Sequence, residues 1–202
     1  MLQITAIKPQ KKDSRFNIFL DGKFSFGLDE ATLVREKLSV GQELSPERIA
    51  TLTQANEVGK LLDKGLRFLS FRPRSEREVR RRLLRRQKRR GAEEEQGGLV
   101  GETISRLRDL GYINDAEFAS WWVEQRIRFR PRGKLLLKSE LFEKGVAREV
   151  IEDALREYSL EDEIGWAKKL AEKRRDECRE RLAAYLARRG FTWEVVGRVL
   201  PR

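Results

Sequence analysis

The chain has 202 residues, of which 38% are charged and 39% are hydrophobic, and its formal net charge is +11. Because it has no histidine and a single cysteine, it lacks Ser-His and Cys-His catalytic dyads, internal disulfides and the commonest transition-metal ligand. No apolar run is long enough to cross a membrane and the first residues hold no secretory signal, so the composition predicts a cytoplasmic, non-enzymatic protein without cofactor or metal.

The first 28 residues have the pattern of a small antiparallel sheet. The clearest signal is Asp21-Gly22 between the aromatic-rich runs Phe16–Leu20 and Lys23–Phe26, because both turn positions of a two-residue hairpin favour positive φ. A weak alternation over residues 4–8 adds a possible third strand. A sheet of two or three strands is too small to be stable alone, so we expect it to pack on the helices that follow.

Two helices are predicted next. A short one runs from Asp29 or Glu30 to Lys37. A longer one begins at Ser45-Pro46-Glu47, with serine as the N-cap and proline at the first helical position. It ends before Pro73, because a residue that precedes proline avoids the α region. Residues 1–60 are therefore predicted to be an N-terminal β hairpin plus a helical extension.

A strongly basic helix follows. Ser75-Glu76-Arg77-Glu78 is a capping box that begins a helix on Glu76, and residues 61–96 carry a net charge of +7. A helix over 77–90 is about 21 Å long. Its arginines would reach several phosphates of one nucleic-acid strand or an acidic protein groove, with binding that weakens as salt is added. The alternative is that the charge run is only a solvated face, as most charge runs are.

The rest of the chain has the pattern of helices separated by glycines. We expect a flexible insert over Gly91–Gly98, a helix over about Val100–Leu110, and a helix capped by Asn114 or Asp115 that runs to Phe129. Five more helices are predicted over residues 132–144, 147–158, 160–178, 179–189 and 192–200, with Gly145 and Gly190 at helix ends.

The helical part repeats itself approximately three times. The pattern of segment 130–158 recurs 45 residues downstream and, less completely, 58 residues upstream, where the offset falls to 47 beyond the insert. A period of about 45–50 residues indicates stacked supersecondary units that share one elongated core. We predict a mainly α protein with three-helix repeats over 61–118, 119–160 and 161–202. The aligned downstream positions are Leu137, Leu141, Gly145, Val146, Val150, Ile151 and Leu155 with Leu182, Leu186, Gly190, Phe191, Val195, Val196 and Leu200, and the upstream ones include Val79 and Leu83.

Arginines recur at equivalent turns of the first two repeats. Arg72-Pro73-Arg74 aligns with Arg130-Pro131-Arg132, and Arg128 lies just before the second turn. The recurrence fits a ridge that faces phosphates and fits equally the chemistry of a helix start, so both interpretations stay open. The candidate binding surface comprises Arg72, Arg74, Arg77, Arg80, Arg81, Arg85, Arg128, Arg130 and Arg132.

Aromatic residues gather on the helix before the second turn. Trp121, Trp122 and Phe129 are candidates for stacking on nucleobases. The same helix also carries Phe118 and Ile127, so we expect at least one tryptophan to belong to the core, and core packing is favoured over stacking.

Three motifs together resemble those of the RecX family, which are bacterial regulators of the RecA recombinase. They are Arg72–Glu78, Gly111–Ala119, and the run from Arg132-Gly133-Lys134 to Val146. The resemblance covers about Leu66–Leu200, and residues 1–60 are more loosely similar to the N-terminal extension of the longer members. The Gly91–Gly98 insert departs from the short turn that is usual in the family.

The resemblance implies tandem three-helix repeats in a curved, elongated monomer. It also implies binding in the helical groove of the RecA–DNA filament, which restrains filament extension, ATP hydrolysis and strand exchange, with single-stranded DNA met through or alongside the filament. Two other functions stay open. One is a general architectural protein that acts on nucleic acid alone, and the other is a helical scaffold for an acidic protein.

Overall fold

The computed structural model describes residues 1–10, 15–87 and 93–200, which form ten helices and four strands. Contacts divide the chain into two compact units, residues 1–68 with 83–109, and residues 69–82 with 110–202. The basic helix α3 (Glu76–Gln87) therefore starts in the second unit and ends in the first. Within the described part, no helix combines the length and the apolar character that a membrane span requires.

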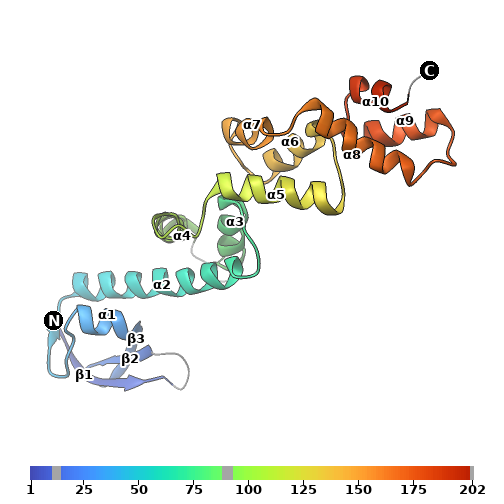
Figure 1. Ribbon diagram of the computed structural model, residues 1–202. Helices are drawn as coiled ribbons and strands as arrows, with labels where there is room; N and C mark the ends of the chain where they lie inside the picture. The colour runs from blue at the N-terminus through green and yellow to red at the C-terminus, as the bar shows by residue number, and fades with distance from the viewer. Residues whose placement is uncertain (11–14, 88–92, 201–202) are drawn as a thin grey trace. The chain divides into compact units, whose positions relative to one another are not determined.

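The sheet has four antiparallel strands, β1 (Leu2–Pro9), β2 (Arg15–Leu20), β3 (Lys23–Asp29) and β4 (Glu43–Leu44), in the order β3-β2-β1-β4. The first three are labelled in Figure 1. The predicted hairpin is confirmed. Its turn residues Asp21 and Gly22 have φ of 46° and 78°. Sequence reasoning missed β4, because a strand of two residues is too short to produce an alternating pattern.

Two helices follow the hairpin at the predicted starts. Asp29 caps the first by accepting a hydrogen bond from the Thr32 N–H at 2.8 Å, and Ser45 caps the second by accepting from the Arg48 N–H at 3.2 Å. These helices are α1 (Glu30–Arg35) and α2 (Pro46–Leu69). The sheet packs against α2 in a core that contains Ile4, Ile18, Leu20, Phe26, Leu28 and Leu52.

The helix α4 (Glu93–Asp109) corrects the prediction for the insert. Residues 93–98, expected to be flexible, form its first turns, and residues 91 and 92 lie outside the described residues. Glutamates are good helix formers and their charge is favourable at a helix N-terminus, which offsets the cost of the two glycines that follow. At Gly65 of α2 an added Cβ would lie 2.7 Å from Leu107 Cδ1, so α2 and α4 approach closely there.

The second unit contains two consecutive groups of three helices (Figure 1). The first group is α5 (Asp115–Phe129), α6 (Lys134–Glu143) and α7 (Arg148–Arg156). The second is α8 (Leu160–Glu172), α9 (Arg179–Arg188) and α10 (Trp193–Val199). The predicted division at 118/119 falls inside α5. The helix α8 ends six residues before the predicted Cys178, because the polar run after Glu172 has no apolar side chain to bury.

The repeat skeleton falls on the core of each group. Leu141 and Ile151 are buried among α5, α6 and α7, and their counterparts Leu186 and Val196 are buried among α8, α9 and α10. Gly145 and Gly190 end α6 and α9 with φ of 83° and 84°, as predicted for residues that terminate a helix in the left-handed region. The mainly α fold with a small N-terminal sheet is thus confirmed.

Candidate functional site

The arginines of α3 differ in their exposure and in whether they form ion pairs within the protein. Arg77, Arg81 and Arg85 follow one another at intervals of four residues, are exposed, and have no ion pair among the residues that the structure describes. Arg80 is half-buried and donates to Glu76 at 3.0 Å. The last residues of the predicted basic run, 88–90, lie outside the described residues. The three exposed guanidinium groups form one side of the helix, which we name the α3 stripe.

The start of α3 is fixed by residues far away in the sequence. The Ser75 hydroxyl accepts from the Glu78 N–H at 3.2 Å and donates to the Lys144 carbonyl at 2.7 Å. The Glu76 N–H donates to Asp115 Oδ1 at 2.8 Å. A Cβ added at Gly145 would lie 2.4 Å from Arg77 Cδ, so the aliphatic part of Arg77 lies across that glycine. The aliphatic part of Arg77, the first arginine of the stripe, is therefore fixed by this packing against Gly145.

The same junction recurs one repeat later. The Gly133 N–H donates to the Arg189 carbonyl at 2.9 Å, as Ser75 donates to the carbonyl that ends α6. The Lys134 N–H donates to Glu163 Oε1 at 2.8 Å, as the Glu76 N–H does to Asp115. In both cases the first turn of a helix, α3 or α6, is capped by a carboxylate from the first helix of the group that follows, α5 or α8.

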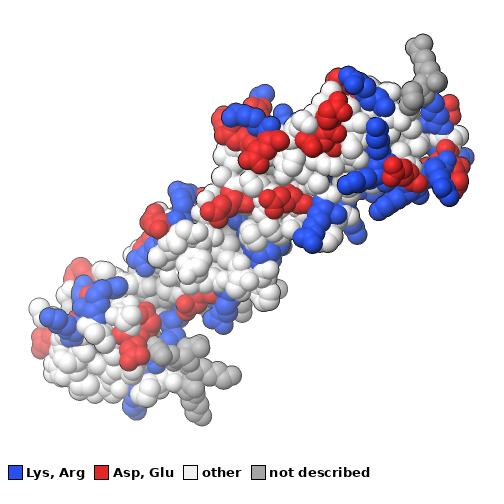
Figure 2. Space-filling view, viewed as in Figure 1, with Lys and Arg blue, Asp and Glu red and all other residues white. Residues whose placement is uncertain are grey.

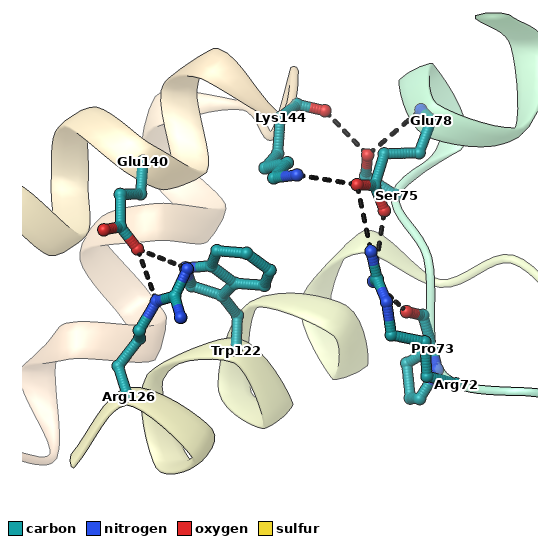
Figure 3. A network of polar contacts seen from close by, with 8 residues as sticks. All are labelled: Arg72, Pro73, Ser75, Glu78, Trp122, Arg126, Glu140 and Lys144. Atoms are coloured by element: carbon teal, nitrogen blue, oxygen red, sulfur yellow. Dashed lines mark hydrogen bonds and ion pairs between the residues drawn. The ribbon is translucent and has the colours of Figure 1, made fainter. Parts of the chain in front are cut away.

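Glu78 organises a first cluster of charges. Its buried carboxylate accepts two hydrogen bonds from Arg72 at 3.2 Å and one from Lys144 at 2.7 Å (Figure 3). Burial alone would raise the pKa of Glu78, but the hydrogen bonds from Lys144 and Arg72 outweigh it and hold the pKa below its usual value. In the predicted capping box, Ser75 accepts from the Glu78 N–H as expected. The Glu78 carboxylate instead accepts hydrogen bonds from Arg72 and Lys144.

Glu140 organises a second cluster on α6. Its Oε2 accepts from Trp122 Nε1 and from Arg126 Nε, each at 2.8 Å (Figure 3). Its Oε1 forms an ion pair with Arg132. Burial lowers the pKa of Arg126 and Arg132, and for Arg132 the neighbouring Arg126 adds to the effect. Both guanidinium groups stay protonated at neutral pH because an arginine pKa starts so high.

Trp122 joins the two clusters. Its ring lies 4.2 Å from Arg126 Cζ and 4.9 Å from Lys144 Nζ, so a cation of each cluster lies near its ring (Figure 3). Trp121 lies under the Arg72 guanidinium at 5.5 Å, and both tryptophans pack against the core around Phe118. These contacts support the interpretation that Trp121 and Trp122 belong to the core and do not stack on nucleobases.

The turn arginines thus divide into two kinds. Arg72 and Arg132 are engaged by buried carboxylates, and Arg74 is half-buried, where burial and then the neighbouring Arg72 lower its pKa. For Arg72, Arg74 and Arg132, the contacts favour a structural role at the start of a helix over a ridge that faces phosphates. Arg128 and Arg130 are exposed at the end of α5. On the face seen in Figure 2, basic and acidic side chains are interspersed. A binding surface on this face is therefore identified by its individual exposed residues and not by net charge.

Sequence reasoning did not predict the two carboxylate clusters. Lys144 lies in the motif that runs from Arg132 to Val146 and Arg126 lies in α5, but neither was assigned a contact with a carboxylate. Glu140 carried a signal, because it lies beside Leu141 and one turn after Leu137 on the apolar side of its helix. A carboxylate in such a position requires hydrogen-bonding or charged partners.

Three family models match the chain. The model of the regulatory protein RecX N-terminal domain matches residues 2–45, that of the first RecX three-helix domain matches 62–87, and that of the second matches 114–155. The matched ranges follow one another in the order of the chain and include the sheet, α3, and the group α5, α6 and α7.

Curated relatives and solved structures agree with the models. The regulatory protein RecX of Bacillus subtilis (strain 168) is 35% identical over 208 residues, covering 98% of this chain and 76% of the relative. The protein of the same name from Listeria welshimeri is 38% identical over 85% of this chain, which spans 62% of that relative's length. A crystal structure of regulatory protein RecX superposes with a TM-score of 0.77 at 28% identity, covering 98% of both chains. For RecX from Lactobacillus salivarius the TM-score is 0.60 at 23% identity, covering 72% of this chain and 95% of that one, which supports the fold alone.

Proposed function

This chain belongs to the RecX family of regulatory proteins, and on that basis we propose that it regulates homologous recombination and DNA repair by binding the RecA–DNA filament. Binding in the filament groove would inhibit filament extension, and with it ATP hydrolysis and DNA strand exchange. The observation that carries the proposal is the α3 stripe, whose three exposed guanidinium groups have no ion pair among the described residues.

The stripe has the chemistry that a polyanionic filament requires. Guanidinium groups bind phosphates and carboxylates through paired hydrogen bonds, so either the DNA or acidic side chains of the recombinase would satisfy them. At physiological salt the attraction extends only about 8 Å, so the stripe acts in close contact and not at long range. Several three-helix groups in one chain would add further weak contacts, and linked contacts strengthen one another.

The test is the hydrolysis of ATP by RecA on single-stranded DNA, with this protein added at far less than one molecule per recombinase. The wild type should suppress hydrolysis at these ratios. The double variant Arg77→Glu with Arg81→Glu should need at least about tenfold more protein, since two charge-assisted contacts become repulsive. A matched control is Arg148→Glu with Arg156→Glu, which makes the same charge change at two exposed arginines of α7.

The control variant should behave as the wild type does. If the α3 variant also retains full suppression, the stripe is only a solvated face and the proposal loses its support. If suppression appears only when the bare DNA is already covered by this protein, competition for phosphates explains it, and the alternative of an architectural protein that binds nucleic acid alone replaces the proposal.

A further inference from the structure

The end of α5 presents an exposed aromatic ring between two exposed arginines. Phe129 is 67% exposed, although a phenylalanine normally contributes to a core. Arg128 Cζ lies 5.3 Å from the centre of its ring. Arg130 follows as the residue that ends the helix, and its backbone N–H donates to the Arg126 carbonyl at 2.9 Å.

Phe129 lines two hollows of the second unit. The first has a volume of about 240 Å³ and also includes Trp121, Gln125 and Arg130 in its wall. The second has a volume of about 560 Å³, and α8 contributes Lys169 and Lys173 to its wall. An enclosed pocket for a drug-sized molecule has roughly 300–1,000 Å³ and buries most of its ligand. The first hollow is below that range, and so suits a small flat group that is part of a larger ligand.

The charges around the ring are mainly positive. Arg128 and Lys169 line the second hollow with Lys173, and the acid Glu172 also lines it. In the part of the chain that the structure describes, no ion pair is found for Arg128, Arg130, Lys169 or Lys173. Arg126 also lines the first hollow but is paired with Glu140. The other four cations of the two hollows, with Glu172 as the single acid in their walls, favour an anionic ligand that also has an aromatic face.

We propose that Phe129 and its two hollows form a binding site for single-stranded nucleic acid. A base stacks on the Phe129 ring, and the neighbouring phosphates contact Arg128 and Arg130 and, on the other side, Lys169 and Lys173. Sites for single strands combine these two elements, because stacking accepts any base and cations follow the backbone. A duplex keeps its base faces covered, and an acidic peptide would use the cations but would leave the ring without a partner.

This site is separate from the α3 stripe, and it is tested without the recombinase, so the two proposals can fail independently. The probe is a thymidine oligonucleotide of about 16 nucleotides, the upper range of single-strand site sizes. An abasic strand of the same length has the phosphates but no base to stack. Affinity is measured by anisotropy of the labelled strands, and quenching of tryptophan fluorescence reports binding beside Trp121.

Three variants separate stacking from charge and from folding. Phe129→Leu keeps an apolar side chain and removes the aromatic face, whereas Phe129→Tyr keeps the face. The matched control is Phe142→Leu, the same change at a phenylalanine of α6 that is 68% exposed. We expect Phe129→Leu to bind the thymidine strand about tenfold more weakly, and the other two variants to bind it as the wild type does.

The abasic strand should bind the wild type and Phe129→Leu equally. Either of two results overturns the proposal. One is that Phe129→Leu binds the thymidine strand as well as Phe142→Leu does, and the other is that it loses the abasic strand to the same extent. Failure of the wild type to bind the thymidine strand at low salt overturns it as well.

Discussion

Ser75 and Lys144 lie 69 residues apart and are joined by a hydrogen bond in which the Ser75 hydroxyl donates to the Lys144 carbonyl at 2.7 Å. Ser75 is fully buried and also accepts from the Glu78 N–H, so one hydroxyl begins α3 and completes the end of α6. This bond connects the basic helix to the three-helix group that follows it.

Replacing Ser75 by alanine removes an N-cap and leaves the Lys144 carbonyl without this donor. We expect a loss of about 2 kcal/mol in the free energy of unfolding. Urea unfolding followed by circular dichroism measures it. The control is Ser159→Ala, which removes an exposed capping box at the start of α8 and should cost about 1 kcal/mol. Equal losses in the two variants would show that the bond to Lys144 adds nothing.

Leu141→Ala tests the repeat register. Leu141 is fully buried at a skeleton position of α6, so its truncation should cost about 2–5 kcal/mol. Leu135→Ala on the same helix is the control, because that side chain is 58% exposed and its loss should change stability by less than about 0.5 kcal/mol. A change below about 0.5 kcal/mol for Leu141→Ala would contradict the register.

Glu78→Gln tests the first charge cluster through pH. The pKa of Glu78 is lower in the folded chain than in the unfolded one, where it is about 4.5. The ion pairs therefore contribute stability above that pH, and the contribution is lost as the pH falls through the lower folded value. Arg72 and Lys144 are 27% and 25% exposed. We therefore expect a loss of about 2–3 kcal/mol at neutral pH, below the usual cost of breaking a buried pair.

The variant should differ less from the wild type at pH 3 than at pH 7 in urea unfolding. Glu152→Gln is a suitable comparison, since its ion pair with Arg148 is exposed and should contribute little at either pH. A difference between Glu78→Gln and the wild type that is independent of pH would mean that the carboxylate acts through packing and not through its charge.

Gly190→Ala tests the close approach between repeats. Gly190 and Gly111 both have a positive φ, of 84° and 76°, so alanine strains the backbone at either by about 1–2 kcal/mol. Only at Gly190 would the new Cβ also meet Leu136, at 2.4 Å from its Cβ, whereas at Gly111 no atom lies within 4 Å. The expected loss is about 3 kcal/mol or more for Gly190→Ala, against about 1–2 kcal/mol for Gly111→Ala. Equal thermal unfolding shifts would rule out a steric contribution from the junction.

Local signals predicted the boundaries of this fold well. Asp21-Gly22, Ser45-Pro46 and Asn114 each act on the two or three residues next to them, and the turns and helix starts lie where these residues require. Residues 93–98 of the predicted insert are helical instead, because glutamates favour a helix more than the glycines of this segment disfavour it. The exact division between repeats was less defined, since a helix such as α5 continues through positions where the pattern changes.

The candidate surface was predictable only in part. Arg77, Arg81 and Arg85 are exposed because the buried side of α3 is formed by Val79 and Leu83, and the helical period of the sequence predicts this. That Arg72 and Arg132 are held by Glu78 and Glu140 depends on contacts made in three dimensions. The exposure of Phe129 likewise depends on where α5 ends relative to its neighbours, which no local pattern encodes.

The caps that Asp115 and Glu163 supply have a consequence for protein synthesis. Each closes the first turn of a helix that the ribosome completes earlier, α3 in one case and α6 in the other. Until the later segment emerges, the Glu76 and Lys134 N–H groups have only water as a partner. During synthesis, the first turn of α3 should therefore stay uncapped until α5 has emerged, and that of α6 until α8 has emerged. Folding of each repeat should lag behind chain elongation by one repeat.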